Sequence, residues 1–131
     1  MVYLNYMLSE LRRRKGRTFL TALGLGVGVA FNPATDPVDV ASVAGDADLV
    51  LCMSINPGYS GQEFMPEAYE RIQTLRAALP ESIYVQVDGG INQENVRQVY
   101  DAGATLLVAG SAIFAREDLP RAYRRLVHEL A

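Results

Sequence analysis

The feature that most constrains the fold of this chain is a regular alternation of short apolar runs and helical patterns. The four apolar runs occupy residues 27–31, 47–55, 82–87 and 105–109. The helical patterns that follow them cover residues 37–44, 66–78, 93–102 and 119–130. Near-continuous apolar strands separated by helices are typical of a parallel sheet that helices cover. We therefore predict an α/β fold in which one β-α unit repeats four times.

Local signals set the expected ends and faces of these helices. Thr35 or Asp36 is the expected N-cap of the first helix, and Asn92 that of the third. Gly103 is the expected end of the third helix. In the second helix apolar side chains recur at helical spacing, which predicts a buried face formed by Tyr69, Ile72, Leu75 and Leu79.

Length, charge and cysteine content exclude several classes of protein. The 131 residues suit one globular domain. The net charge of −3 argues against general nucleic-acid binding, which needs a basic face. The single cysteine, Cys52, excludes an internal disulfide framework and a multi-cysteine metal site, and we expect it to be buried and inert. We predict a cytoplasmic protein that has no nucleic-acid partner.

The first residues differ in charge from the rest of the chain. Residues 1–30 carry five Lys and Arg residues against one acidic residue, Glu10. The apolar run over residues 19–31 is shorter than the about 20 residues that cross a bilayer, so we expect no membrane partner. The segment resembles the N-terminus of an FtsX/MacB-type ABC-transporter permease in the stretch YLNYMLSELRRRKGRTFLTALGLGVGVA. We therefore predict a basic, apolar helix over residues 1–26 that is foreign to a domain over 27–131.

Two other interpretations of the N-terminal segment stay open. It is equally compatible with a helix that packs on the following domain and exposes its basic cluster to solvent. A non-catalytic interaction or membrane-peripheral protein, whose basic helix lies on anionic lipid, is the alternative from a different functional class.

Four β-α units suit half of a (β/α)8 barrel, whose full form needs about 250 residues. They also suit a small open sheet. Small and polar residues follow each predicted strand, and barrel enzymes keep their sites at that end of the strands. We therefore favour a partial (β/α)8 barrel preceded by an N-terminal helix.

Four motifs carry a resemblance to a family. They are similar, in order, to the fifth to eighth β-α units of ribulose-phosphate 3-epimerase, and they read GVAFNPATDP, DLVLCMSINPGYSGQEFMPEAYERI, VQVDGGIN and GATLLVAGSAIF. The resemblance implies interconversion of D-ribulose 5-phosphate and D-xylulose 5-phosphate at C3. It implies two aspartates as acid and base, a divalent metal (zinc, manganese, iron or cobalt) and a phosphorylated pentulose as partner. A related phosphosugar barrel, such as a hexulose-phosphate epimerase, shares these loops and stays an alternative.

The same resemblance assigns roles to individual residues. Asp88, in VDGG, is implied as a catalytic residue, a metal ligand and a substrate contact, and Met53 as a residue that lines the reaction centre. The other implied substrate and phosphate contacts are Gly58, Tyr59, Ser60, Gly61, Gly89, Gly90, Ile91, Gly110 and Ser111. Glycine suits this role because a backbone without a side chain lets N–H groups approach an anion.

Part of the family pattern is missing from the 131 residues. No HxD motif occurs, and the one histidine, His128, falls in the last predicted helix, where we expect it to face solvent. One carboxylate does not serve both faces of C3, and one ligand does not hold zinc tightly. We therefore expect the chain by itself to be inactive and to bind no metal tightly. The edges of a half barrel, near Val29 and Val108, lack neighbours and predict self-association.

Overall fold

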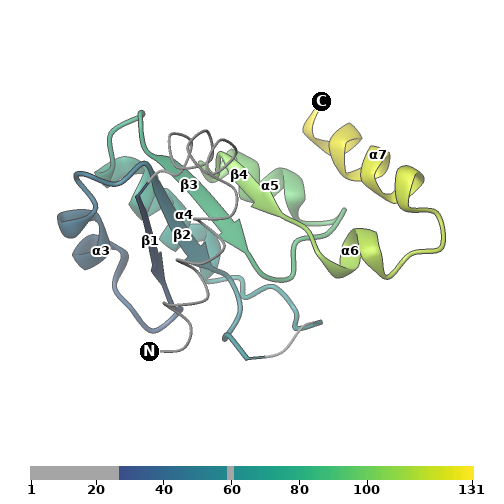
Figure 1. Ribbon diagram of the computed structural model, residues 1–131, viewed down its shortest axis with the longest axis horizontal. Coiled ribbons are helices and arrows are strands. Elements are labelled where there is room, and N and C mark those ends of the chain that lie inside the picture. The colour runs from purple at the N-terminus through teal and green to yellow at the C-terminus, as the bar shows by residue number, and fades with distance from the viewer. Residues whose placement is uncertain (1–26, 59–60) are drawn as a thin grey trace, which may run out of the picture.

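The structure is a computed structural model that describes residues 27–58 and 61–131 (Figure 1). The predicted helix and permease resemblance over residues 1–26, and the predicted contacts Tyr59 and Ser60, lie outside the described residues. The described elements are β1 (Gly28–Phe31), α3 (Pro37–Val43), β2 (Leu49–Met53), α4 (Ala68–Ala78), β3 (Tyr84–Asp88), α5 (Val96–Asp101), β4 (Leu106–Val108), α6 (Ser111–Phe114) and α7 (Leu119–Leu130).

The strands form one parallel sheet in chain order, β1-β2-β3-β4. The ladders between neighbouring strands are all parallel, with Val50 opposite Val85 and Val87 opposite Leu107. The α/β fold and the four β-α units are therefore confirmed. Because all strands run the same way, the loops that follow them meet at one edge of the sheet.

One face of the sheet carries the core. Val50 and Cys52 of β2 and Val85 and Val87 of β3 are fully buried and alternate with more exposed neighbours. They belong to one apolar cluster with buried side chains of α4, which lies behind the sheet in Figure 1. Helices are expected to cover this face, because apolar strands of a parallel sheet are buried against helices.

The second face of the sheet is more exposed. Strand β3 presents Tyr84, Gln86 and Asp88 there, because alternate residues of a strand share a face. Gln86 therefore shares the face of Asp88. On β4, Leu106 and Val108 are 39% and 37% exposed.

The predicted helix boundaries are confirmed in part. Asp36 caps α3 by accepting a hydrogen bond from the Val38 N–H at 2.8 Å. Gly103 ends the α5 region at a φ of 113°. The prediction that Asn92 is the N-cap of α5 is wrong, because α5 begins at Val96. The Asn92 side chain instead accepts a hydrogen bond from the Glu94 N–H at 2.8 Å. Such a local side-chain bond stabilises a turn in place of the first helical turn.

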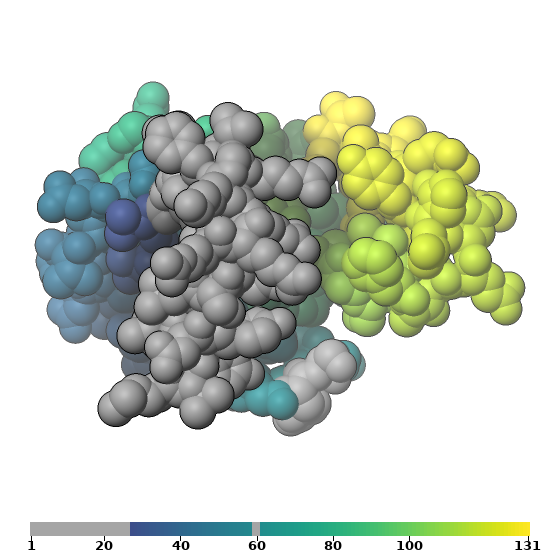
Figure 2. All heavy atoms as spheres, in the orientation of Figure 1, coloured from purple at the N-terminus to yellow at the C-terminus, as the bar shows by residue number. Residues whose placement is uncertain are grey.

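The second and last helices match their predicted patterns. Ile72, Leu75 and Leu79 are buried, while Tyr69 is partly buried and its ring lies 4.8 Å from that of Phe64. Helix α7 has the predicted bounds, and the short α6 before it was not predicted. In the space-filling view α6 and α7 form a lobe at one end of the molecule (Figure 2). Among the described helices, none is both long enough and apolar enough to cross a membrane.

Candidate functional site

The predicted reaction-centre residues meet at the end of β3. Met53 is the ladder partner of Asp88 on β2, and Val108 is its partner on β4. All three side chains are on the more exposed face of the sheet, and the Asp88 carboxylate makes no hydrogen bond or ion pair with the described residues. The fold therefore brings Asp88 and Met53 together on one face of the sheet.

A buried serine holds the turn after Asp88. The Ser54 N–H donates to the Asp88 carbonyl at 2.9 Å. Its hydroxyl donates to the carbonyl oxygens of Asp88 and Gly89, at 2.9 and 2.7 Å. The role of Ser54 was not predicted from the sequence. The signal available was a hydroxyl directly after a buried strand, where a polar group needs partners.

Gly89 and Gly90 have a structural reason to be glycine. Their φ values are 125° and 65°, in the region that L side chains rarely adopt. A Cβ on Gly89 would lie 2.5 Å from Ile55 Cγ1. One on Gly90 would overlap the backbone nitrogen of Phe64 and lie 2.8 Å from its Cα. The chain therefore turns closely against the segment before α4 at this point.

Asn95 positions the loop that follows these glycines. Its side chain accepts a hydrogen bond from the Asn92 N–H and donates one to the Gly90 carbonyl, both at 2.9 Å. Asn95 is one of the few buried polar residues of the described chain. This role was not predicted, because Asn95 falls inside the helix that the sequence predicts over residues 93–102.

A cavity of about 690 Å³ lies beside this loop. It brings together predicted contacts from three strand-end segments, namely Gly61, Gly90, Ile91 and Ser111. Within residues 27–58 and 61–131, no acceptor takes the backbone N–H groups of Gly90, Ile91, Ser111 and Ala112. The cavity wall therefore offers unused backbone donors, which suit an anion.

The remaining predicted contacts lie outside the cavity lining. Gly89 and Gly110 each precede a residue that lines it, Gly58 lies three positions before the first lining residue, and Asp88 lies on the sheet face two residues before Gly90. The wall also carries Glu63, Glu94 and Arg116. The site thus has two parts, an N–H-lined cavity and a carboxylate on the sheet face.

Arg71 is a further residue that sequence analysis missed. From α4 its guanidinium donates to the Asn32 carbonyl at 2.7 Å and to the Met53 carbonyl at 3.4 Å. It also lies 4.9 Å from the centre of the Phe31 ring, a cation–π geometry. The side chain therefore ties together the ends of β1 and β2.

Cys52 is buried on the covered face, as predicted. Burial raises the pKa of its thiol, and the nearby Arg71 guanidinium lowers that pKa to a smaller extent. Because the thiolate is the reactive form, the raised pKa accords with an inert thiol.

The described residues do not fit the divalent metal that the family resemblance implies. They contain no group of three or more His, Cys, Asp and Glu side chains that surrounds a common point. The ladder neighbours of Asp88 are a methionine and a valine, which do not ligate a hard cation. His128 is exposed on α7, as expected. We therefore assign no chemical step to a metal here.

The parallel sheet and its β-α units are consistent with part of a TIM-type barrel, and the cavity lies at the ends of its strands. A solved structure of 3-hexulose-6-phosphate synthase is similar to the chain, with a TM-score of 0.63 and 23% identity. The match covers 85% of this chain and 52% of that one. At this identity the likeness shows the fold alone, and the predicted partial barrel is consistent with it.

Sequence comparisons identify the family. The model for the ribulose-phosphate 3 epimerase family matches residues 14–114. Ribulose-phosphate 3-epimerase of Escherichia coli strain K12 is 38% identical over 111 residues, which is 82% of this chain and 49% of the relative. Ribulose-phosphate 3-epimerase of Bacillus subtilis strain 168 is 39% identical over 103 residues, which is 76% of this chain and 48% of the relative. The chain belongs to the ribulose-phosphate 3-epimerase family, and it spans about half the length of these relatives.

Proposed function

We propose that this chain supplies the phosphate-binding part and one proton-transferring carboxylate of a site for the interconversion of D-ribulose 5-phosphate and D-xylulose 5-phosphate. The observation that supports this most is the cavity with unused N–H groups at the strand ends that also carry Asp88. The names of the relatives point to the same substrate class. A cytosolic location and the domain boundary near residue 26 stay predictions.

The phosphate group would occupy the N–H-lined cavity. The backbone N–H groups of Gly90 and Ile91, after β3, and of Ser111 and Ala112, at the start of α6, would serve as its donors. Oriented backbone N–H groups bind anions without the side-chain entropy that lysine or arginine loses. Ser54 and Asn95 support this arrangement, because they hold the β3 loop in place through the Asp88, Gly89 and Gly90 carbonyl groups.

Asp88 would act as one of the two proton-transferring groups. A carboxylate positioned over a sugar carbon can remove or return a proton, a contribution of about 10²–10⁴-fold. Inversion also needs a group on the opposite side of that carbon. Among the described residues that share the face with Asp88, none is acidic. We therefore propose that the chain by itself does not turn over.

The activity experiment mixes the purified chain with ribulose 5-phosphate and either manganese or zinc. A coupled enzyme assay follows xylulose 5-phosphate, with the Escherichia coli relative as the positive control. The expected result is no turnover. Turnover that disappears in Asp88→Asn would contradict the proposed inactivity and would show that another group supplies the second proton.

A binding experiment tests the cavity separately from catalysis. Ribulose 5-phosphate should bind weakly and be displaced by inorganic phosphate. Gly110→Leu, which adds bulk beside Ser111, should abolish this binding, whereas Asp88→Asn should retain it. Binding that Gly110→Leu leaves unchanged would contradict the proposed location of the phosphate.

A further inference from the structure

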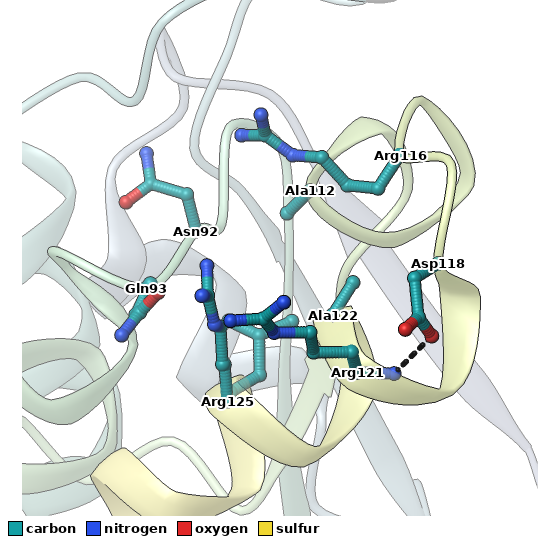
Figure 3. Close-up of a pocket in the computed structure, with 9 residues that line it drawn as sticks. Asn92, Gln93, Ala112, Arg116, Asp118, Arg121, Ala122 and Arg125 are labelled. Atoms are coloured by element: carbon teal, nitrogen blue, oxygen red, sulfur yellow. Dashed lines mark hydrogen bonds between the residues drawn. The ribbon is translucent and has the colours of Figure 1, made fainter.

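A second, smaller pocket of about 270 Å³ lies between the loop before α5 and helix α7. Three arginines line it: Arg116 from the segment after α6, and Arg121 and Arg125 from α7. Figure 3 shows the Arg121 and Arg125 guanidinium groups on the side of α7 that faces Asn92 and Gln93. We call this the arginine pocket.

The positive charge of the arginine pocket is not balanced by its neighbours. Within residues 27–58 and 61–131, none of the three guanidinium groups makes a salt bridge or a side-chain hydrogen bond. The wall carries one carboxylate, Asp118, which accepts a hydrogen bond from the Arg121 backbone N–H at 2.9 Å and so caps α7. Arg121 and Arg125 are four residues apart on one helix, where like charges destabilise each other.

We propose that the arginine pocket binds the dianion of a phosphate monoester. A guanidinium presents two parallel N–H groups that match two oxygens of a phosphate, and it stays charged at every physiological pH. The Asn92 amide is held by the Glu94 N–H and the Gly90 carbonyl, so the arginines are the groups that meet the phosphate. Ala122 and Leu126 form an apolar wall for the carbon part of the ester. A bound dianion would also relieve the repulsion between Arg121 and Arg125.

The arginine pocket adjoins the proposed substrate site but has a different lining. Arg116, Asn92 and Ala112 line both cavities, so the two are neighbours. Gly90, Ile91 and Ser111 line the larger cavity and are absent from the lining of the smaller one. A ligand with two phosphate groups would therefore have a place for each. The pocket does not depend on the proposed epimerase function.

The test is a titration of the ¹⁵N-labelled full chain with methyl phosphate, followed by NMR. We expect the Nε–Hε signals of Arg121 and Arg125 to shift and saturate. Arg125→Ala should weaken this binding about tenfold or more, because it removes a charge-assisted hydrogen bond. Arg124→Ala is the matched control, since Arg124 lies on the same helix and does not line the pocket. If both variants weakened binding equally, the effect would come from the loss of one positive charge and not from the pocket, and the proposal would be overturned.

Two further measurements sharpen the test. Asp118→Asn removes the carboxylate from the wall and keeps a good N-cap residue, so methyl phosphate should bind more tightly without loss of helix stability. Arginine does not titrate in this range, so affinity should rise as the ester loses its second proton, near a pKa of about 6. Shifts confined to the backbone signals of Gly90 and Ser111 would show that phosphate uses the larger cavity alone and would overturn the proposal. Gly110→Leu should leave the arginine signals responsive.

Discussion

The central β-α unit and the C-terminal part of the chain contain helices of similar length that are buried to different extents. The central unit (β2, α4 and β3) has an 11-residue helix that buries Ala68, Ile72 and Leu75. The terminal unit (α6 and α7) has a 12-residue helix that buries Leu126. The same helix leaves Tyr123 and Val127 59% and 44% exposed.

The difference follows from position in the sheet. Helix α4 belongs to the crossover between β2 and β3, and both strands have neighbours on each side. Helix α7 follows β4, which is an edge strand of the described sheet. Helix α4 packs on β2 and β3 as well as on neighbouring helices, whereas α7 packs against α5 and α6, so α7 has less apolar surface to cover. In a closed barrel the edge would be paired.

The largest expected effect is a contrast between two leucine truncations. Leu75→Ala in α4 should lower the free energy of unfolding by about 2–5 kcal/mol, because it leaves a cavity under a fully buried side chain. Leu119→Ala in α7, where the leucine is 41% exposed, should cost about 1 kcal/mol or less. Urea denaturation of both variants measures the difference. Equal costs would show that the terminal unit is packed as tightly as the central one.

A second contrast concerns two strand-end glycines. Gly90→Ala should destabilise the protein by about 1–3 kcal/mol, because φ is positive and the new Cβ meets the Phe64 backbone. A Cβ on Gly110 meets no atom within 4 Å and φ is −92°, so Gly110→Ala should leave the melting temperature unchanged. Thermal denaturation by circular dichroism compares them. Marked destabilisation by Gly110→Ala would give this glycine a role in folding.

The unpaired edges predict self-association at micromolar concentrations. Strands β1 and β4 each have one neighbour within the described sheet. Val108→Lys on β4 should weaken the association several-fold, because a charge at an edge opposes strand pairing. Val43→Lys on α3 makes the same change at a site that is 72% exposed, and should have no effect. Sedimentation velocity provides the masses, and a monomeric wild type would contradict the prediction.

The smallest expected effect is a pH dependence from Cys52 beneath α4. Burial raises the pKa of the folded thiol, whereas the unfolded thiol ionises near its ordinary pKa of about 8.5. The thiol's contribution to stability is therefore fully present below that pH and is lost as the pH rises above it, by at most about 1.4 kcal/mol per pH unit. Unfolding free energies of wild type and Cys52→Ala, measured from pH 7.5 to 10, should converge. Parallel curves would show that the thiol titrates equally in both states.

The sequence by itself determined the order and type of most elements. Apolar runs and helical spacing are local patterns, so they located all four strands, the bounds of α7 and the buried face of α4. The Asp36 cap and the Gly103 helix end were also predictable, because each depends on a residue's own backbone or on a neighbour two positions away. The four motifs also identified the family, which the comparisons confirm.

Tertiary structure decided which residues hold the site together. Ser54 bonds to residues 34 and 35 positions away, and Arg71 reaches a carbonyl 39 positions away. No local pattern predicts such partners, because they meet only after parallel strands align in register. The same holds for the arginine pocket, where α7 packs beside the loop before α5. Spacing along the chain specifies elements, whereas the site depends on which of them the sheet brings together.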